Sequence, residues 1–296
     1  MPLDPIMLQQ LRDNDAPLKK LEFRHQDLSD EDFKELFQAL RTNTKVKELS
    51  ITGNGFSHLS LEALEEMLRF NTSLTTLILS HNFASFDASV DAFVDDAASP
   101  MQTTWCIAGF LAPSLAGNTS LTELALDGNQ IGNAGLGSLI EAIPSTITRL
   151  DLSDNQISDV TALSTFLKTN ESLKVVELWD NDLSDEGALK LWESMAYNST
   201  LEVLSVGRNQ ISAGLEEKLQ QLVQSNRSVV APKTTPKSTP LQGRVTRLEQ
   251  AHAEQAKVIG DLQQKLQDQS ELFQQLGDVF SKPLKKKRKR KNLGTD

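Results

Sequence analysis

Apolar and polar residues follow one recurring pattern along residues 18–226 of the 296-residue chain. The pattern is LxxLxLxxNxL, in which other aliphatic residues can replace leucine, and LTELALDGNQI at residues 121–131 is a clear copy. The copies begin at Leu18, Val46, Leu74, Leu121, Ile147, Leu173 and Leu201. The spacing between successive starts is nearly constant, and only the step from Leu74 to Leu121 is much longer. A period this regular predicts a row of stacked structural repeats.

Each repeat is predicted to contain one short strand and one helix. In the copy at 121–131, Leu121, Leu124 and Leu126 fall on one side of a strand and its approach, so stacking buries them in a continuous column. The segment after each strand carries apolar residues at helical spacing, as in Phe33, Leu36, Phe37 and Leu40. The predicted fold class is α/β, a solenoid with a parallel inner sheet and outer helices.

Two series of asparagines keep a fixed phase with the pattern. The first series ends each strand, and its amides are expected to bond backbone groups where the chain turns. It comprises Asn54, Asn82, Asn129, Asn155, Asn181 and Asn209, with Gln26 in the first copy. The second series precedes each copy by three residues and comprises Asn43, Asn71, Asn118, Asn170 and Asn198. Four of these five begin N-x-Ser/Thr sequons, but we interpret them as left-handed helix C-caps rather than as glycosylation sites.

The repeats resemble leucine-rich repeats of the ribonuclease-inhibitor-like subclass, which have a similar period and a helix in every repeat. The resemblance covers roughly residues 18–226, and it implies a horseshoe whose concave sheet face binds another protein. The long interval between Leu74 and Leu121 departs from the subclass, and residues 84–104 are predicted to be an inserted acidic loop or short amphipathic helix. The predicted leucine-rich-repeat domain spans residues 18–228, after an N-terminal cap at 1–17.

Carboxylates gather between the buried positions of the later repeats, around a single tryptophan. The predicted partner-binding residues are Trp179, Asp127, Asp151, Asp154, Glu177 and Asp180. An aromatic side chain among charges is typical of a binding hot spot, and the acidity would steer a basic protein partner toward it. The alternative is that the charges only solubilise the sheet and that Trp179 packs along its neighbours.

The sequence gives little support for catalysis or membrane insertion. It has no nucleophile elbow, phosphate-binding glycine loop or metal-ligand spacing, so we predict no enzyme activity, no cofactor and no metal. No apolar run approaches the ~20 residues needed to span a bilayer, and the single Cys106 fits a reducing compartment, so a soluble, unsecreted protein is expected. Ran GTPase activators have similar repeats. That likeness leaves a regulator of this type, acting through Arg12, Arg24 or Arg41, as an alternative.

The chain after the repeats changes in character. Residues 229–242 contain three prolines and are predicted to form a linker. Residues 243–281 carry apolar residues at heptad spacing from Val245, which predicts a coiled coil and a homo-oligomer. The histidine at 252 and the glutamines at 255 and 269 occupy core heptad positions and weaken that seam.

The C-terminal tail, residues 282–296, is strongly basic. Residues 231–296 carry 14 Lys/Arg and 7 Asp/Glu, a net charge of +7, whereas residues 1–230 carry 16 and 33, a net charge of −17. The predicted nuclear localisation signal is Lys285, Lys286, Lys287, Arg288, Lys289, Arg290 and Lys291. It would bind an importin-type receptor, and contact with lipid headgroups or nonspecific contact with nucleic acid are the alternatives.

Together these features predict a non-enzymatic protein-interaction scaffold. It would bind a partner on the concave face, oligomerise through the coiled coil, and act in the nucleus, with the cytoplasm as a second compartment. A pathogen effector that acts in a host nucleus is a further alternative.

Overall fold

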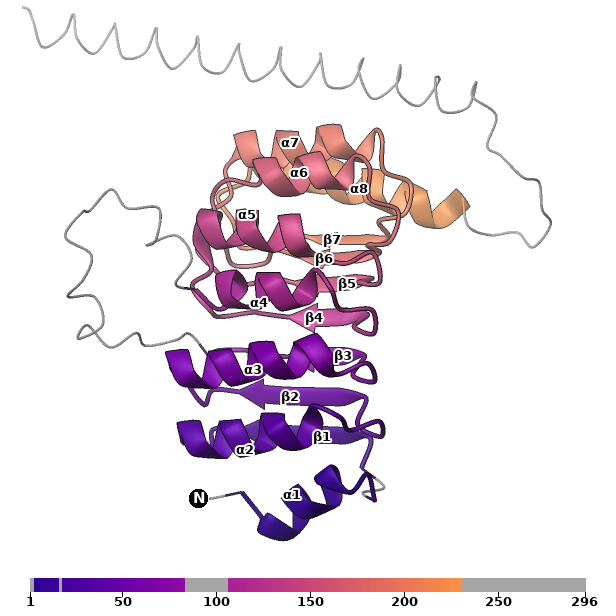
Figure 1. The fold of residues 1–296 in the computed structure, drawn as a ribbon. Coiled ribbons are helices and arrows are strands. Elements are labelled where there is room, and N and C mark those ends of the chain that lie inside the picture. Colours follow the sequence, from indigo (N-terminus) through magenta and orange to yellow (C-terminus); the bar gives the residue numbers. More distant parts are fainter. Residues whose placement is uncertain (1–2, 16–17, 83–105, 230–296) are drawn as a thin grey trace, which may run out of the picture. The chain divides into compact units, whose positions relative to one another are not determined.

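Seven parallel strands form one sheet in the computed structural model, which describes residues 3–15, 18–82 and 106–229. The strands follow the chain in order, so each one pairs with the strand of the next repeat (Figure 1). Their bounds are β1 Lys20–Arg24, β2 Glu48–Thr52, β3 Thr76–Ile78, β4 Glu123–Ala125, β5 Arg149–Asp151, β6 Val175–Glu177 and β7 Val203–Ser205. The register joins equivalent positions, as in Leu124 beside Leu150.

A layer of helices covers one face of this sheet, and each helix packs against the next (Figure 1). The helices are α1 Pro5–Arg12, α2 Asp30–Leu40, α3 His58–Phe70, α4 Ile107–Leu115, α5 Gly132–Ala142, α6 Thr161–Leu167, α7 Asp185–Met195 and α8 Ala213–Val229. The predicted α/β solenoid with its parallel inner sheet is confirmed. The helical spacing read from Phe33, Leu36, Phe37 and Leu40 corresponds to the buried face of α2.

The core lies between the sheet and the helices. Leu121, Leu124 and Leu126 are 0–1% exposed, and their equivalents in the neighbouring repeats are buried in the same way. Leu18, in the first repeat, is an exception at 38% exposure. Helix α1 packs against α2 and buries Leu8 and Leu11, within the segment predicted as an N-terminal cap.

The first asparagine series bonds backbone groups at the turns, as predicted, and it also connects consecutive repeats. Asn155 is fully buried, and its Nδ2 donates to the Leu126 carbonyl of the preceding repeat at 2.9 Å. Its Oδ1 accepts from the backbone amides of Asn129 and Ile131, at 3.0 and 3.2 Å. Each such amide therefore satisfies backbone groups that the turn after a strand would otherwise leave buried and unpaired.

The second asparagine series also bonds backbone groups, but the predicted left-handed conformation is wrong. Asn71 caps α3 with φ −74° and ψ 123°, and the other four members also lack a positive φ. Asn71 Oδ1 accepts from the amides of Ser73 and Leu74, while Nδ2 donates to the Leu40 carbonyl of the preceding repeat at 2.6 Å. The side chain, rather than a left-handed backbone, closes the turn, and the sequon serine is part of that turn.

A further member of this series, Asn226, was not predicted. It lies one repeat after Asn198, is 6% exposed, and donates to the carbonyls of Asn198 and Leu201 at 3.3 and 2.9 Å. Its spacing of 28 residues from Asn198 could have predicted it, although the strand motif does not recur after Asn226. The predicted acidic insertion (84–104), linker (229–242), coiled coil (243–281) and basic tail (282–296) lie outside the described residues, except that Val229 ends α8.

Candidate protein-binding face

The face of the sheet that points away from the helices, called here the outward face, carries the side chains that alternate with the buried ones. In β1 the burial alternates residue by residue, with Leu21 and Phe23 inside and Lys20, Glu22 and Arg24 outside. The parallel register places Asp151 of β5 directly beside Glu177 of β6. Two carboxylates predicted for partner binding are therefore neighbours on this outward face.

The residue two places after the third apolar position of each motif copy, such as Phe23 or Leu126, has a left-handed backbone in all seven described repeats. This position is occupied by His25, Gly53, His81, Gly128, Asp154, Asp180 and Arg208, with φ between 47° and 68°. Glycine tolerates this conformation without strain, and Asp and His are among the side chains enriched in it. The Asp154 amide donates to the Trp179 carbonyl at 2.9 Å, so Asp154 lies beside the turn that contains Trp179 and Asp180.

Trp179 is 40% exposed and is held from two sides by the next repeat. A Cβ added to Gly207 would lie 3.0 Å from Trp179 Cδ1, so the indole lies against the bare glycine backbone. The guanidinium carbon of Arg208 lies 4.3 Å from the indole centroid, and Arg208 Nη1 is 3.6 Å from Asp180 Oδ2. Trp179 thus packs along its neighbours and still presents a large aromatic surface to solvent.

The five acidic residues differ in how far their charge is already compensated. Glu177 is paired with Arg149 of the adjacent strand, and Asp180 is paired with Arg208. Asp151 accepts the Ser153 amide at 3.0 Å. Within the described ranges neither Asp151 nor Asp154 forms an ion pair, so these two carboxylates carry the uncompensated charge of the cluster.

Asp127 lies in the repeat next to that of Asp151 and Asp154 but two repeats from Trp179, and the amide of its neighbour Leu126 donates to the Asp151 carbonyl at 2.9 Å. Asp127 accepts from Ser80 Oγ at 2.6 Å and lies 3.6 Å from His81 Nε2, and its side chain is only 25% exposed. Ser153 occupies the equivalent position in the repeat between Asp127 and Trp179. Asp127 thus borders the cluster with its carboxylate already engaged by Ser80 and His81, and we call Asp151, Asp154, Glu177, Trp179 and Asp180 the Trp179 patch.

Sequence reasoning missed two basic residues of this region, Arg149 and Arg208. Arg149 lies about one repeat before Glu177, and Arg208 lies one repeat after Asp180. In a stacked repeat, residues one period apart are spatial neighbours, so the period itself was a usable signal. With these two guanidiniums the patch has less net negative charge than its carboxylates alone suggest.

The arginines considered for a GTPase-activating role are each paired with a carboxylate. Arg12 lies 3.8 Å from Glu35, Arg41 lies 3.1 Å from Glu66, and Arg24 is paired with Glu22. Arg41 also lies over the Phe70 ring, with 4.0 Å from its guanidinium carbon to the ring centroid. These interactions hold the three side chains on the protein surface and give no specific support to that alternative.

Other kinds of site find no counterpart in the described part of the chain. No group of three or more His, Cys, Asp or Glu side chains is arranged there to hold a metal ion. None of the described helices combines the length and the apolar character needed to span a membrane. Cys106 is half-buried, and its sulfur lies against Gly135, where an added Cβ would be 2.5 Å from Sγ.

Comparisons with known proteins agree with the repeat architecture. A family model described as "Leucine Rich repeat" matches residues 117–139, 144–162 and 169–191. No curated protein matches the chain significantly. Among solved structures, the tropomodulin C-terminal domain from Caenorhabditis elegans is 13% identical with a TM-score of 0.31, over 75% of this chain and 92% of that one. Actin-binding site 2 of leiomodin-1 is 14% identical with a TM-score of 0.29, over 82% of this chain and 95% of that one.

At these TM-scores neither solved structure informs the function of the chain. The three matched segments coincide with the repeats that contain β4 to β6 and their flanking helices. These three segments of the chain therefore match leucine-rich repeats, and the described repeats stack as an α/β solenoid.

Proposed function

We propose that the outward face of the sheet binds a basic segment of a protein partner at the Trp179 patch, without catalysing a reaction. The observation that carries this proposal is the half-exposed indole of Trp179, held in place by Gly207 and Arg208. An aromatic side chain that is already ordered loses little conformational entropy on binding. Large, pre-positioned aromatic residues are the most frequent binding hot spots.

The charges beside Trp179 favour a basic partner. Asp151 and Asp154 have no ion-pair partner in the described residues, and both border the turn or strand next to Trp179. A Lys or Arg side chain of the partner would supply the missing counter-charge while its aliphatic part covers the indole. The acidic repeat region, with a net charge of −17 over residues 1–230, would accelerate the encounter with such a segment.

The test is capture of partners from a nuclear extract of the native organism, followed by mass spectrometry. The variant Trp179→Ala with Asp151→Ser and Glu177→Ser should lose the partner that the unchanged protein captures. A matched control, Glu22→Ser with Glu48→Ser, removes two carboxylates from the first strands of the same face and should retain it. Equal capture by the patch variant, with unchanged circular dichroism, would refute the proposal.

We further propose that the chain self-associates through residues 243–281, so that two or more repeat domains act together. Presenting several copies of a weak site raises the effective concentration of that site for a multivalent partner. Sedimentation of the full chain should give an oligomer, and a chain that ends at Lys237 should give a monomer. A monomeric full chain at micromolar concentration would contradict this proposal.

The basic cluster Lys285–Lys291 is proposed to direct the protein to the nucleus through an importin-type receptor. Seven consecutive basic residues fit an acidic receptor groove better than they fit base stacking, because no aromatic residue is interleaved with them. A fluorescent fusion with Lys286, Lys287, Arg288 and Lys289 changed to Ala should lose its nuclear enrichment. An unchanged distribution would show that the cluster does not set localisation.

A further inference from the structure

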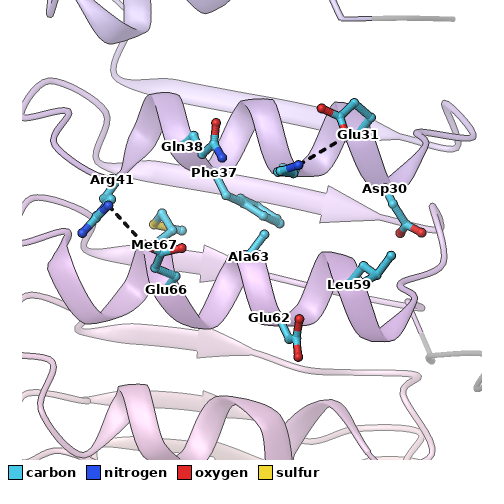
Figure 2. Close-up of a pocket in the computed structure, with 11 residues that line it drawn as sticks. Asp30, Glu31, Phe37, Gln38, Arg41, Leu59, Glu62, Ala63, Glu66 and Met67 are labelled. Carbon is cyan, nitrogen blue, oxygen red and sulfur yellow. Dashed lines mark ion pairs between the residues drawn. The ribbon is translucent and has the colours of Figure 1, made fainter.

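A groove lies between α2 and α3 in the helical layer, away from the outward face of the sheet (Figure 2). Its volume is about 290 Å³. Phe37, Ala63 and Met67 line its apolar part, and Leu59 borders one end with 62% of its surface exposed. A volume at the lower limit of small-molecule pockets accommodates a few side chains rather than a cofactor.

The groove is open because α3 has a small residue at its centre. Ala63 lies eight residues before Asn71, and the equivalent residue of α4, eight before Asn118, is Phe110. The Phe110 ring lies 5.3 Å from the His58 ring of α3, so an aromatic side chain occupies the helical surface between α3 and α4. Between α2 and α3 a methyl group stands at that position, beside Phe37 (Figure 2).

The charges along the groove are unevenly compensated. Lys34 lies 3.6 Å from Glu31, and Arg41 lies 3.1 Å from Glu66, so two of the four rim carboxylates already have a permanent cation. Of the other two, Asp30 lies at the same end as the exposed Leu59, whereas Glu62 extends from the side of α3 that faces away from α2 (Figure 2). Asp30 accepts from Ser57 Oγ at 2.6 Å, and Glu62 lies 3.3 Å from His58 Nε2. Neither has a lysine or arginine partner among the described residues.

We propose that this groove binds a short, basic amphipathic segment of another protein. A large apolar side chain of that segment fills the space above Ala63, in the way that Phe110 fills the equivalent position of the next repeat. Its Lys or Arg side chains pair with Asp30 and Glu62, which gives the groove a preferred direction. An amphipathic helix laid into an apolar groove is a recurrent mode of peptide recognition, and the exposed Leu59 extends the contact.

This site is independent of the proposed sheet-face function. The Trp179 patch lies on the outward face of β5 and β6, whereas the groove lies in the helical layer between α2 and α3. One repeat domain can therefore hold two different partners at once. Loss of either site should leave the other intact.

The experiment is nuclear magnetic resonance of the full chain with isotope-labelled methionine methyl groups and tryptophan indole N–H groups. Met67 reports on the groove, and Met195, which is 4% exposed in α7, is the internal control. The probe is a synthetic helical peptide with leucines on one face and lysines on the other. The same peptide with glutamates in place of the lysines is its matched partner.

The leucine–lysine peptide should shift the Met67 signal and leave the Met195 signal unchanged, while the leucine–glutamate peptide should shift neither. Ala63→Phe should weaken peptide binding, measured from the Met67 shift, at least about tenfold because the new ring fills the groove. Glu62→Gln should also weaken binding, without changing the apolar residues that line the groove. An unmoved Met67 signal, an equal response to the acidic peptide, or binding that is insensitive to Ala63→Phe would overturn the proposal. A shift confined to the Trp179 indole would place the peptide on the sheet face and also overturn it.

Discussion

At the scale of single residues, buried asparagine amides connect one repeat to the next. Their recurrence at one fixed position of the motif could be read from the sequence, because a polar residue that recurs in an apolar motif is expected to bond backbone groups. Which backbone atoms they bond could not be predicted. Asn71 closes its turn through Oδ1 and reaches the preceding repeat through Nδ2, and both contacts depend on the distance between repeats rather than on local preference.

Asn155→Ala should destabilise the protein by about 3 kcal/mol. The substitution removes the acceptor of the buried Asn129 and Ile131 backbone amides, and each unsatisfied buried group costs ~1–3 kcal/mol. The Leu126 carbonyl keeps its second donor, Asn129 Nδ2, at 2.8 Å. Urea unfolding followed by circular dichroism measures the change. Asn133→Ala is the control, since the exposed Asn133 bonds Ser158 and Asp159 at the surface and should cost less than about 1.5 kcal/mol. Equal costs would show that burial of the amide is unimportant.

At the scale of single elements, the strands and helices followed from hydrophobic spacing, but the contents of the candidate site did not. Spacing decides which face of an element is buried, so the outward positions of Asp151, Glu177 and Trp179 were predictable. The pairing of Glu177 with Arg149, and the stacking of Arg208 on Trp179, depend on the register between strands. The register becomes visible only when the period is used to align residues of consecutive repeats.

Helix α2 begins with a reciprocal capping box, and this cap makes stability depend on pH. The Ser29 hydroxyl bonds the Asp32 carboxylate and, together with the Ser29 and Leu3 backbone amides, holds the pKa of Asp32 below its ordinary value of 3.8, against the opposing effect of burial. A carboxyl whose pKa is lowered by folding stabilises the folded state fully above its ordinary pKa. That contribution is lost as the pH falls through the folded-state value.

Asp32→Asn should therefore lower the free energy of unfolding by about 1 kcal/mol at neutral pH, which is typical for loss of a cap. The difference in free energy of unfolding between Asp32→Asn and the unchanged protein should become smaller as the pH falls below 3.8, the ordinary pKa of the Asp32 carboxyl, because that carboxyl is then increasingly protonated in the unfolded chain. Urea unfolding at a series of pH values tests this. Glu31→Gln removes a charge from the same helical turn without touching the Ser29 bonds, and it should show no such narrowing. A stability difference between Asp32→Asn and the unchanged protein that stays constant down to the acid unfolding transition would contradict the role of the ionised Asp32 carboxylate in this cap.

At the scale of the whole repeat domain, each repeat packs mainly against its immediate neighbours. The strands pair in strict chain order, and the helices pack in the same order. This arrangement followed from the constant period, because a repeat that cannot bury its own apolar face must stack on the next one. The free energy of unfolding of such a stack is approximately a sum of contributions from single repeats and from the contacts between neighbouring repeats. A destabilising substitution should therefore affect mainly its own repeat and the adjacent one.

Leu204→Ala tests this locality. Leu204 is 4% exposed in the last strand, and truncation of a buried leucine costs about 2–5 kcal/mol. Hydrogen exchange should accelerate in β6, β7, α7 and α8 and remain slow in β1, β2 and α2. A uniform acceleration across all seven strands would instead show that the repeats unfold as a single cooperative unit.

The long interval after Leu74 has a practical consequence. The Asn82 backbone N–H donates to Asn129 Oδ1 at 2.8 Å across 47 residues of sequence. The Asn54 backbone N–H donates to Asn82 Oδ1 at the same distance across only 28 residues. The stacking of β3 on β4 is thus indifferent to the length of chain between β3 and α4. Because doubling a connection costs only about 0.6 kcal/mol in closure entropy, this junction is a natural position for grafting. An epitope, a reporter or a small folded domain could be inserted there while the repeats on both sides keep their register.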